Sequence, residues 1–111
     1  MPEIQKKKYD LEDRTLEFAK KIKNFIDKLP KSTSNLEISR QLMRSGGSIG
    51  ANYIEANESL GKKDFLMKIR ICRKEAKETR YWLKLLDEKI LSEEAMEYMR
   101  IFGSILEKFK I

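Results

Sequence analysis

Apolar residues recur at helical spacing in four stretches of the chain, and short polar connections separate these stretches. Asp10, a residue type that often caps helices, precedes the first stretch, and Pro30 follows it. We therefore predict a first helix over residues 11–29. Its apolar positions, three, four or seven residues apart, are Leu11, Phe18, Ile22, Phe25 and Leu29.

The second stretch predicts a helix over residues 35–57, with apolar positions Leu42, Ile49, Tyr53 and Ala56. Its middle is unusual, because Gly46, Gly47 and Gly50 each cost about 1 kcal/mol relative to alanine inside a helix. Residues without large side chains also let another helix approach closely. We expect tight packing over this segment, and a bend at Gly46 and Gly47 is the alternative.

The third stretch has the most regular pattern and predicts a helix over residues 62–87. Its apolar and small residues alternate steps of four and three for three heptads, at Phe65, Ile69, Cys72, Ala76, Thr79, Leu83 and Leu86. Ser92 followed by Glu93 and Glu94 is a typical helix start. A fourth helix is therefore predicted over residues 92–110, with apolar positions Met99, Phe102, Leu106 and Phe109.

Four helices with short connections indicate a single all-α domain over residues 1–111. Helices that follow one another through short connections pack as antiparallel neighbours. The predicted fold is therefore an up-down-up-down antiparallel four-helix bundle.

Composition supports a packed helical protein and argues against a membrane protein. Apolar residues make up 41% of the 111 residues and charged residues 38%, which is typical of helices with narrow apolar stripes. No apolar run approaches the roughly 18 to 20 residues needed to cross a bilayer, and residues 1–10 lack a signal-peptide core. The single cysteine, Cys72, cannot form an internal disulfide. We expect a cytoplasmic protein with Cys72 in its core.

The charge of the chain biases it toward anionic partners. Lysine and arginine number 24 against 18 acidic residues, which gives a net charge of +6. Residues 62–89 hold ten basic and five acidic side chains, and Lys6, Lys7 and Lys8 form a basic arm near the start of the chain. Nucleic acid and acidic protein surfaces are the polyanions that such a distribution attracts.

The chain contains no histidine, which excludes several chemistries known in helical proteins. A di-iron site of the bundle type needs a Glu-x-x-His spacing, and Ser-His-Asp or Cys-His nucleophiles need an imidazole. Zinc sites that combine cysteine and histidine need one as well. Residues 45–50 also lack the lysine and the preceding strand of a phosphate-binding loop. We therefore predict a protein that is not an enzyme, with no catalytic residue, metal or cofactor.

Two blocks of sequence carry a family resemblance. The first is SIGANYIEA at residues 48–56, and the second comprises KDF at 63–65, KEA at 74–76 and ETRYWL at 78–83. With these blocks the chain resembles the four-helix-bundle family of bacterial-type proteins named for the intervening sequences of 23S ribosomal RNA genes that encode them. One departure is Gly61, where related sequences often have a helix-capping serine. We expect a weaker cap there, for which Ser59 could substitute.

The resemblance implies a left-handed bundle that assembles into a ring-like homo-oligomer, a pentamer. It also links the chain to the accessory variability proteins of diversity-generating retroelements, which bind nucleic acid and a reverse transcriptase. For most members of the family no activity is established. The partners expected from the resemblance are therefore further copies of the chain, RNA or DNA, and a reverse transcriptase.

One side of the third predicted helix carries candidate nucleic-acid-binding residues. Cations in a line can follow a phosphate backbone, and an aromatic ring can stack on an unpaired base. The alternative is an ordinary charged outer face, partly neutralised by Glu75 and Glu78. The candidates, which lie opposite the apolar stripe, are Lys63, Arg70, Lys74, Lys77, Tyr81 and Lys84.

A second set of polar residues is predicted to stabilise helix packing. Asn52 and Glu55 lie beside the apolar line of the second helix, where a carboxylate needs a partner. Arg73 and Arg80, seven residues apart on one flank of the third helix, are the predicted partners of Glu55. We expect a structural network with no ligand.

Surplus apolar residues lead us to expect self-association. Ile71, Trp82 and Leu85 lie off the main stripe of the third helix, and Ile101 and Ile105 widen that of the fourth. A core wider than a strict seam is the alternative. The sequence therefore favours a homo-oligomeric accessory protein that binds nucleic acid, and the alternative is a protein-interaction scaffold with no nucleic-acid role.

Overall fold

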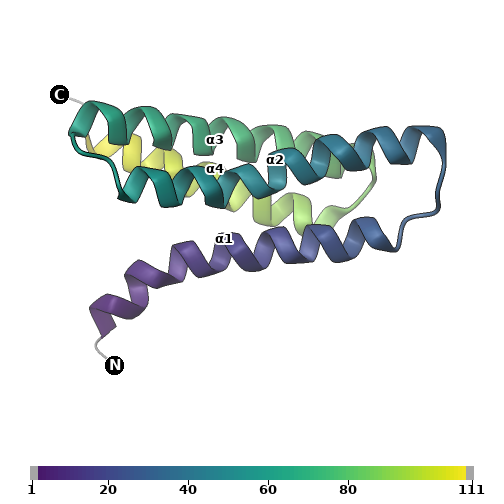
Figure 1. The fold of residues 1–111 in the computed structure, drawn as a ribbon, viewed down its shortest axis with the longest axis horizontal. Helices are drawn as coiled ribbons and strands as arrows, with labels where there is room; N and C mark the ends of the chain where they lie inside the picture. The colour runs from purple at the N-terminus through teal and green to yellow at the C-terminus, as the bar shows by residue number, and fades with distance from the viewer. Residues whose placement is uncertain (1–2, 110–111) are drawn as a thin grey trace.

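The computed structural model describes residues 3–109, with side chains from residue 11 onward, and it consists of four packed helices (Figure 1). They are α1 (Glu3–Asp27), α2 (Thr33–Asn57), α3 (Lys62–Leu85) and α4 (Lys89–Lys108), and the described range contains no strand. The predicted all-α four-helix bundle is confirmed. Its up-down-up-down order and left-handed twist remain predictions.

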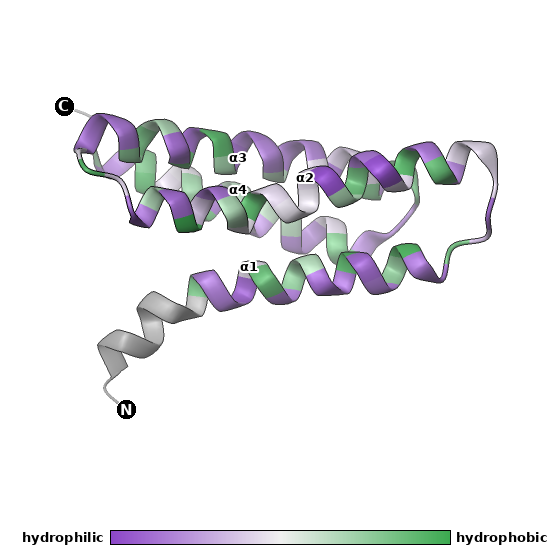
Figure 2. Ribbon diagram, in the orientation of Figure 1, coloured by the Kyte–Doolittle hydropathy of each residue, from purple (hydrophilic) through white to green (hydrophobic). Residues whose placement is uncertain are grey.

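Each helix contributes apolar side chains to one core. Figure 2 shows how apolar and polar residues alternate along the helices, as an amphipathic pattern requires. Aromatic pairs join distant segments, since the rings of Phe18 and Tyr98 lie 5.2 Å apart and those of Tyr53 and Phe102 lie 5.8 Å apart. The fully buried apolar residues are Phe18, Ile22, Leu42, Ile49, Ile69, Cys72, Ala76, Leu83, Ala95, Tyr98 and Phe102.

The first helix differs from the prediction at both ends. The predicted cap Asp10 lies inside the helix, which begins at Glu3. The helix ends at Asp27, before the predicted Leu29, because proline disfavours helical backbone at the residue before it. The Leu29 amide instead closes a final turn on the carbonyl of Ile26, at 3.1 Å.

Capping side chains explain the boundaries of α2 and α3. The Ser32 hydroxyl accepts a hydrogen bond from the Asn35 amide at 3.1 Å, so α2 begins at Thr33. Gly61 offers no such group to α3, as predicted, and the Ser59 hydroxyl donates to the Glu55 carbonyl of α2 and does not cap α3. Helix α3 ends at Leu85, two residues early, because Asp87 adopts a left-handed conformation with φ of 58°.

Helix α4 begins earlier than predicted because Glu88, and not Ser92, caps it. The Glu88 carboxylate accepts hydrogen bonds from the amides of Ile90 and Leu91 at 2.9 and 3.2 Å. Ser92 lies buried inside the helix and its hydroxyl donates to the Lys89 carbonyl. The helix therefore runs from Lys89 to Lys108, whereas residues 92–110 were predicted.

Two glycines of α2 allow α1 to pack closely against it. A Cβ atom on Gly46 would lie 2.5 Å from Cδ1 of Ile22, and one on Gly50 would lie 2.8 Å from Oγ1 and 3.2 Å from Cβ of Thr15. A Cβ on Gly47 would meet nothing within 4 Å. Helix α2 runs through all three glycines without interruption. Tight packing, and not a break in the helix, is therefore the confirmed role of Gly46 and Gly50.

The close contact between α1 and α2 leads to a prediction that has an internal control. Gly50→Ala should lower the free energy of unfolding by about 1 to 2 kcal/mol, because overpacking against Thr15 outweighs the gain in helix propensity. Gly47→Ala should raise it by about 0.5 to 1 kcal/mol, because the methyl group enters open space. Urea denaturation followed by circular dichroism measures both. Equal stabilisation by the two substitutions would contradict the close approach of α1 and α2.

Candidate nucleic-acid interface

The predicted nucleic-acid-binding residues lie together on the solvent-facing side of α3. The side of the helix that carries Ile69, Cys72, Ala76, Thr79 and Leu83 is buried in the bundle. The opposite side is exposed, and we call it the outer face of α3. It carries all six candidates, Lys63, Arg70, Lys74, Lys77, Tyr81 and Lys84.

The cations of the outer face form a regular row. Lys63, Arg70, Lys77 and Lys84 are each seven residues apart, and seven residues of α-helix rise about 10.5 Å. The row therefore extends over about 32 Å. Lys74 lies beside it, and the exposed Met67 and Tyr81 are each seven residues from Lys74.

The acidic residues in the middle of α3 pair mainly with α2 and not with this row. Glu75 is only 6% exposed, and its carboxylate accepts a hydrogen bond from Nη1 of Arg44 on α2 at 3.1 Å. The second amino group of Arg44 donates to the Glu78 carboxylate. Lys74 also approaches Glu75, but at 3.9 Å the contact is at the limit of an ion pair. Arg44 thus supplies most of the charge that balances these two carboxylates.

The pKa values of Glu78 and Arg44 are shifted by the same ion pair. The hydrogen bond from Arg44 is the main cause that lowers the pKa of Glu78, and the bond from the Trp82 indole, at 3.0 Å, acts in the same direction. Burial opposes the shift but does not cancel it. Reciprocally, the Glu78 carboxylate is the main cause that raises the pKa of Arg44. Both groups are therefore held in their charged forms near neutral pH.

A shallow hollow lies at the C-terminal part of the outer face of α3. It is lined by Lys77, Arg80, Tyr81, Lys84 and Leu85. Tyr81 is 61% exposed and Leu85 is 52% exposed, so two apolar side chains stand among three cations. We call this set the Tyr81 hollow.

The predicted network around Glu55 takes a different form. Glu55 pairs with Lys68 at 2.7 Å, and Asn52 donates within its own helix to the Ser48 carbonyl at 2.9 Å. The predicted ion pairs from Glu55 to Arg73 and Arg80 are therefore wrong. The reason is geometric, because α2 covers one flank of α3 while Arg73 lies on the other, with its Cδ 4.0 Å from the position of a Cβ on Gly103 of α4.

The part of the chain with described side chains holds no group of acidic residues or cysteine suited to a metal ion. Cys72 is fully buried, as predicted, and burial raises the pKa of its thiol to about 12. Such a thiol stays protonated and is a poor nucleophile. In the same described range, no helix is long and apolar enough to span a membrane.

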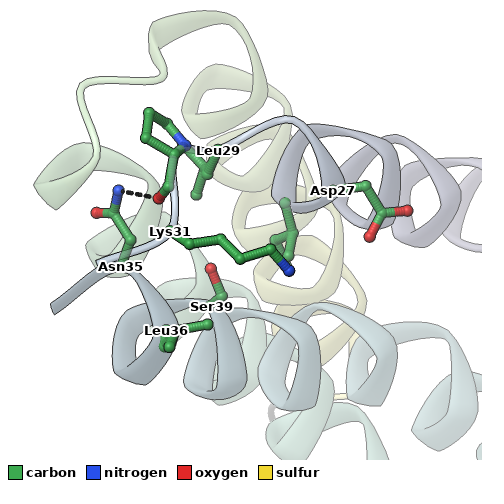
Figure 3. Close-up of a pocket in the computed structure, with 8 residues that line it drawn as sticks. Asp27, Leu29, Lys31, Asn35, Leu36 and Ser39 are labelled. Atoms are coloured by element: carbon green, nitrogen blue, oxygen red, sulfur yellow. Dashed lines mark hydrogen bonds between the residues drawn. The ribbon is translucent and has the colours of Figure 1, made fainter. Parts of the chain in front are cut away.

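A second hollow lies at the turn between α1 and α2 (Figure 3). At this hollow the Asn35 side-chain amide donates a hydrogen bond to the Pro30 carbonyl at 2.8 Å, which braces the turn. The charged residues at its edge are Asp27 and Lys31, both exposed. This hollow offers no set of side chains for acid–base or nucleophilic chemistry.

The lowered pKa of Glu78 predicts an acid-sensitive contribution to stability. A carboxylate whose pKa is depressed by folding stabilises the protein above its unfolded pKa, and this stability is lost as the pH falls through the folded value. Glu78→Gln should therefore lower the free energy of unfolding by about 1 kcal/mol at pH 7 and by progressively less below about pH 4.5. Urea denaturation at several pH values measures this difference.

Glu37→Gln is the matched control, because Glu37 is exposed and its partners, Arg40 and Gln41, lie within one turn of the same helix. Its effect should stay below about 0.5 kcal/mol at every pH. A pH-independent effect of Glu78→Gln would contradict the assignment of the shift to Arg44.

Comparison with known proteins supports the resemblance seen in the sequence. The family described as 23S rRNA-intervening sequence protein matches residues 7–104. A crystal structure of a protein of unknown function from the S23 ribosomal protein family of Bacteroides thetaiotaomicron superposes with a TM-score of 0.75. It is 33% identical in sequence, and the match covers 86% of this chain and 96% of that one. No functionally curated protein is significantly similar.

Neither description names a catalytic activity. The family match covers all of α2 and α3, which carry Arg44 and the outer face of α3, and most of α1 and α4. The chain belongs to the family of 23S rRNA-intervening sequence proteins.

Proposed function

We propose that the protein is a homo-oligomer that binds nucleic acid along the outer face of α3. The observation that carries this proposal is the separation of charge on α3. Its two central carboxylates, Glu75 and Glu78, are paired with Arg44 of α2, while the five cations of the outer face are exposed to solvent. Exposed cations whose neighbouring carboxylates are already paired with another helix remain available to a phosphate backbone.

The number of cations sets the expected salt dependence. Each phosphate neutralised by a cation releases condensed counterions, so the logarithm of the affinity falls linearly with the logarithm of salt concentration. Five contacts give a slope of about −4.5 for duplex DNA and about −3.5 for a single strand. Lys6, Lys7 and Lys8, whose side chains lie outside the described residues, would add to this slope.

The family description supports the choice of nucleic acid over an acidic protein. It ties the family to an intervening sequence of 23S rRNA, and the similar crystal structure is described under a ribosomal protein family. Neither phrase names a ligand of this chain. Both are in keeping with a protein whose partner is RNA or DNA, and a reverse transcriptase is a further partner that the resemblance suggests.

Self-association is the second part of the proposal. Of the residues singled out for it from the sequence, Leu85 is exposed and Ile71 is half-buried. Trp82, Ile101 and Ile105 pack against the core of a single chain, which accords with the wider-core alternative. Leu16 and Ile54, in contrast, are 53% and 50% exposed. Leu16 follows Thr15, and Ile54 lies one turn after Gly50, so we propose that the two side chains form an apolar patch beside the contact between Thr15 and Gly50.

An oligomer would also strengthen weak binding by each chain. A ring brings several outer faces of α3 within reach of one strand, so that later contacts form at high effective concentration. We propose the ring-like pentamer on the basis of the family resemblance. A modest net charge per chain then suffices for useful affinity.

Charge reversal tests the proposed surface. Lys74, Lys77 and Lys84 changed together to glutamate should weaken binding of a single-stranded oligonucleotide at least tenfold at low salt and flatten the salt slope by about 2 to 3. Fluorescence anisotropy at several salt concentrations measures both quantities. Circular dichroism checks that the variant is folded.

The matched control carries the same change of net charge elsewhere, with Lys23, Lys28 and Lys31 changed to glutamate near the α1–α2 turn. It should weaken binding much less. Equal losses in the two triple variants would refute the outer face of α3 as the binding surface. Absence of binding even at low salt would favour the protein-interaction scaffold instead.

Light scattering tests the oligomer. The wild-type protein should elute at micromolar concentration with a mass several times the 13.1 kDa of one chain. Leu16→Glu combined with Ile54→Glu should lower this mass, because charges would enter the apolar patch. Leu60→Glu is the control, since Leu60 is fully exposed in the α2–α3 connection and should leave the mass unchanged. A monomeric wild type would contradict the proposal.

A further inference from the structure

We infer that the Tyr81 hollow is a base-stacking subsite, which makes single-stranded nucleic acid, and not a duplex, the ligand of the outer face of α3. The inference rests on the proposed function and specifies its ligand class. It adds Arg80 and Leu85 to the residues expected from the sequence.

The composition of the hollow suits a nucleotide with an exposed base. Tyr81 and Leu85 offer apolar surface, and Lys77, Arg80 and Lys84 surround them with positive charge. An unpaired base has two apolar faces and is attached to anionic phosphates. The base can therefore stack on the ring of Tyr81 while the flanking phosphates contact the cations.

The fold does not require an aromatic side chain at this position. Tyr81 is 61% exposed and faces away from the core side of α3, which is filled by residues such as Thr79 and Leu83. The ring of Tyr81 therefore adds little apolar area to the core of the fold. The exposed ring in a row of cations is explained by a ligand that has an aromatic face of its own.

The ring of Tyr81 is braced by a chain of contacts that leads back to α2. It lies edge-to-face with Trp82, with centroids 5.0 Å apart and an interplanar angle of 78°. The Trp82 indole donates to Glu78, which Arg44 holds in turn. Trp82 also packs against the core. A ring held in this way loses less conformational entropy when a base stacks on it.

A duplex would make poorer use of the same surface. The bases of a duplex are paired and stacked inside it. The exposed side of a protein helix such as α3 therefore contacts mainly phosphates and sugars. Tyr81 and Leu85 would then lie against the charged backbone and would break the row of cations between Lys77 and Lys84. A single strand avoids this conflict because its bases can turn outward.

The test compares single strands of equal length and charge that differ in their bases, and it adds a duplex of the same length. Oligo-dT, oligo-rU, an abasic DNA strand of about 12 nucleotides and a duplex of the same length are titrated by fluorescence anisotropy. Oligo-dT and oligo-rU distinguish DNA from RNA as the source of the unpaired base. The wild type should bind at least one of them about 5- to 100-fold more tightly than the abasic strand, and more tightly than the duplex.

Two substitutions at one position separate stacking from charge. Tyr81→Ala should remove most of the difference between the base-bearing and abasic strands and leave the salt slope unchanged. Tyr81→Phe should keep that difference, because phenylalanine retains the ring. Trp82, the single tryptophan of the chain, gives a second readout, since its emission should change with the base-bearing strand and not with the abasic one.

Four other outcomes would refute the base-stacking subsite, and they can be told apart. Equal affinity of the wild type for base-bearing and abasic strands, or an undiminished difference in Tyr81→Ala, refutes stacking and leaves charge-based binding intact. Failure of every strand to bind at low salt refutes the proposed function as well. A lower mass of Tyr81→Ala in light scattering would assign the hollow to contacts between copies of the chain.

Discussion

Arg44 of α2 reaches across the α2–α3 groove to the carboxylates of Glu75 and Glu78, and the charge that α3 presents to solvent depends on this interaction. Glu75 is nearly buried, so the loss of Arg44 would leave a carboxylate in a poorly solvated site with only the distant Lys74 beside it. The pairing thus stabilises the contact between two helices. It also balances the charge of two carboxylates that would otherwise offset the cations of the outer face.

The other three helices support α3 and leave its outer face exposed. Helices α2 and α4 cover the two flanks of α3, as the pairs Arg44–Glu78 and Arg73–Gly103 show. Helix α1 packs over α2 through Gly46 and Gly50 and leaves the outer face of α3 open. The exposed cations and Tyr81 are therefore carried by a helix that is supported on every other side.

The apolar periodicity was sufficient to predict the four helices, because each helix buries one continuous stripe. It was not sufficient for the helix ends, where Glu88 caps α4 although glutamate is an uncommon cap. The exposed cations followed from spacing within one helix. The partners of Glu55, Glu75 and Glu78 could not be predicted in this way. They depend on which flank of α3 each neighbouring helix covers, and periodicity carries no such information. Arg44 was missed for this reason.

Lysine footprinting tests whether single-stranded nucleic acid covers the outer face of α3. Acetylation of surface lysines, quantified by mass spectrometry with and without a bound single-stranded oligonucleotide, reports which side chains the ligand covers. We expect protection of Lys63, Lys74, Lys77 and Lys84, with little change at the exposed lysines of α1, Lys20, Lys21 and Lys23. Protection that is uniform over the surface, or strongest on α1, would contradict this expectation.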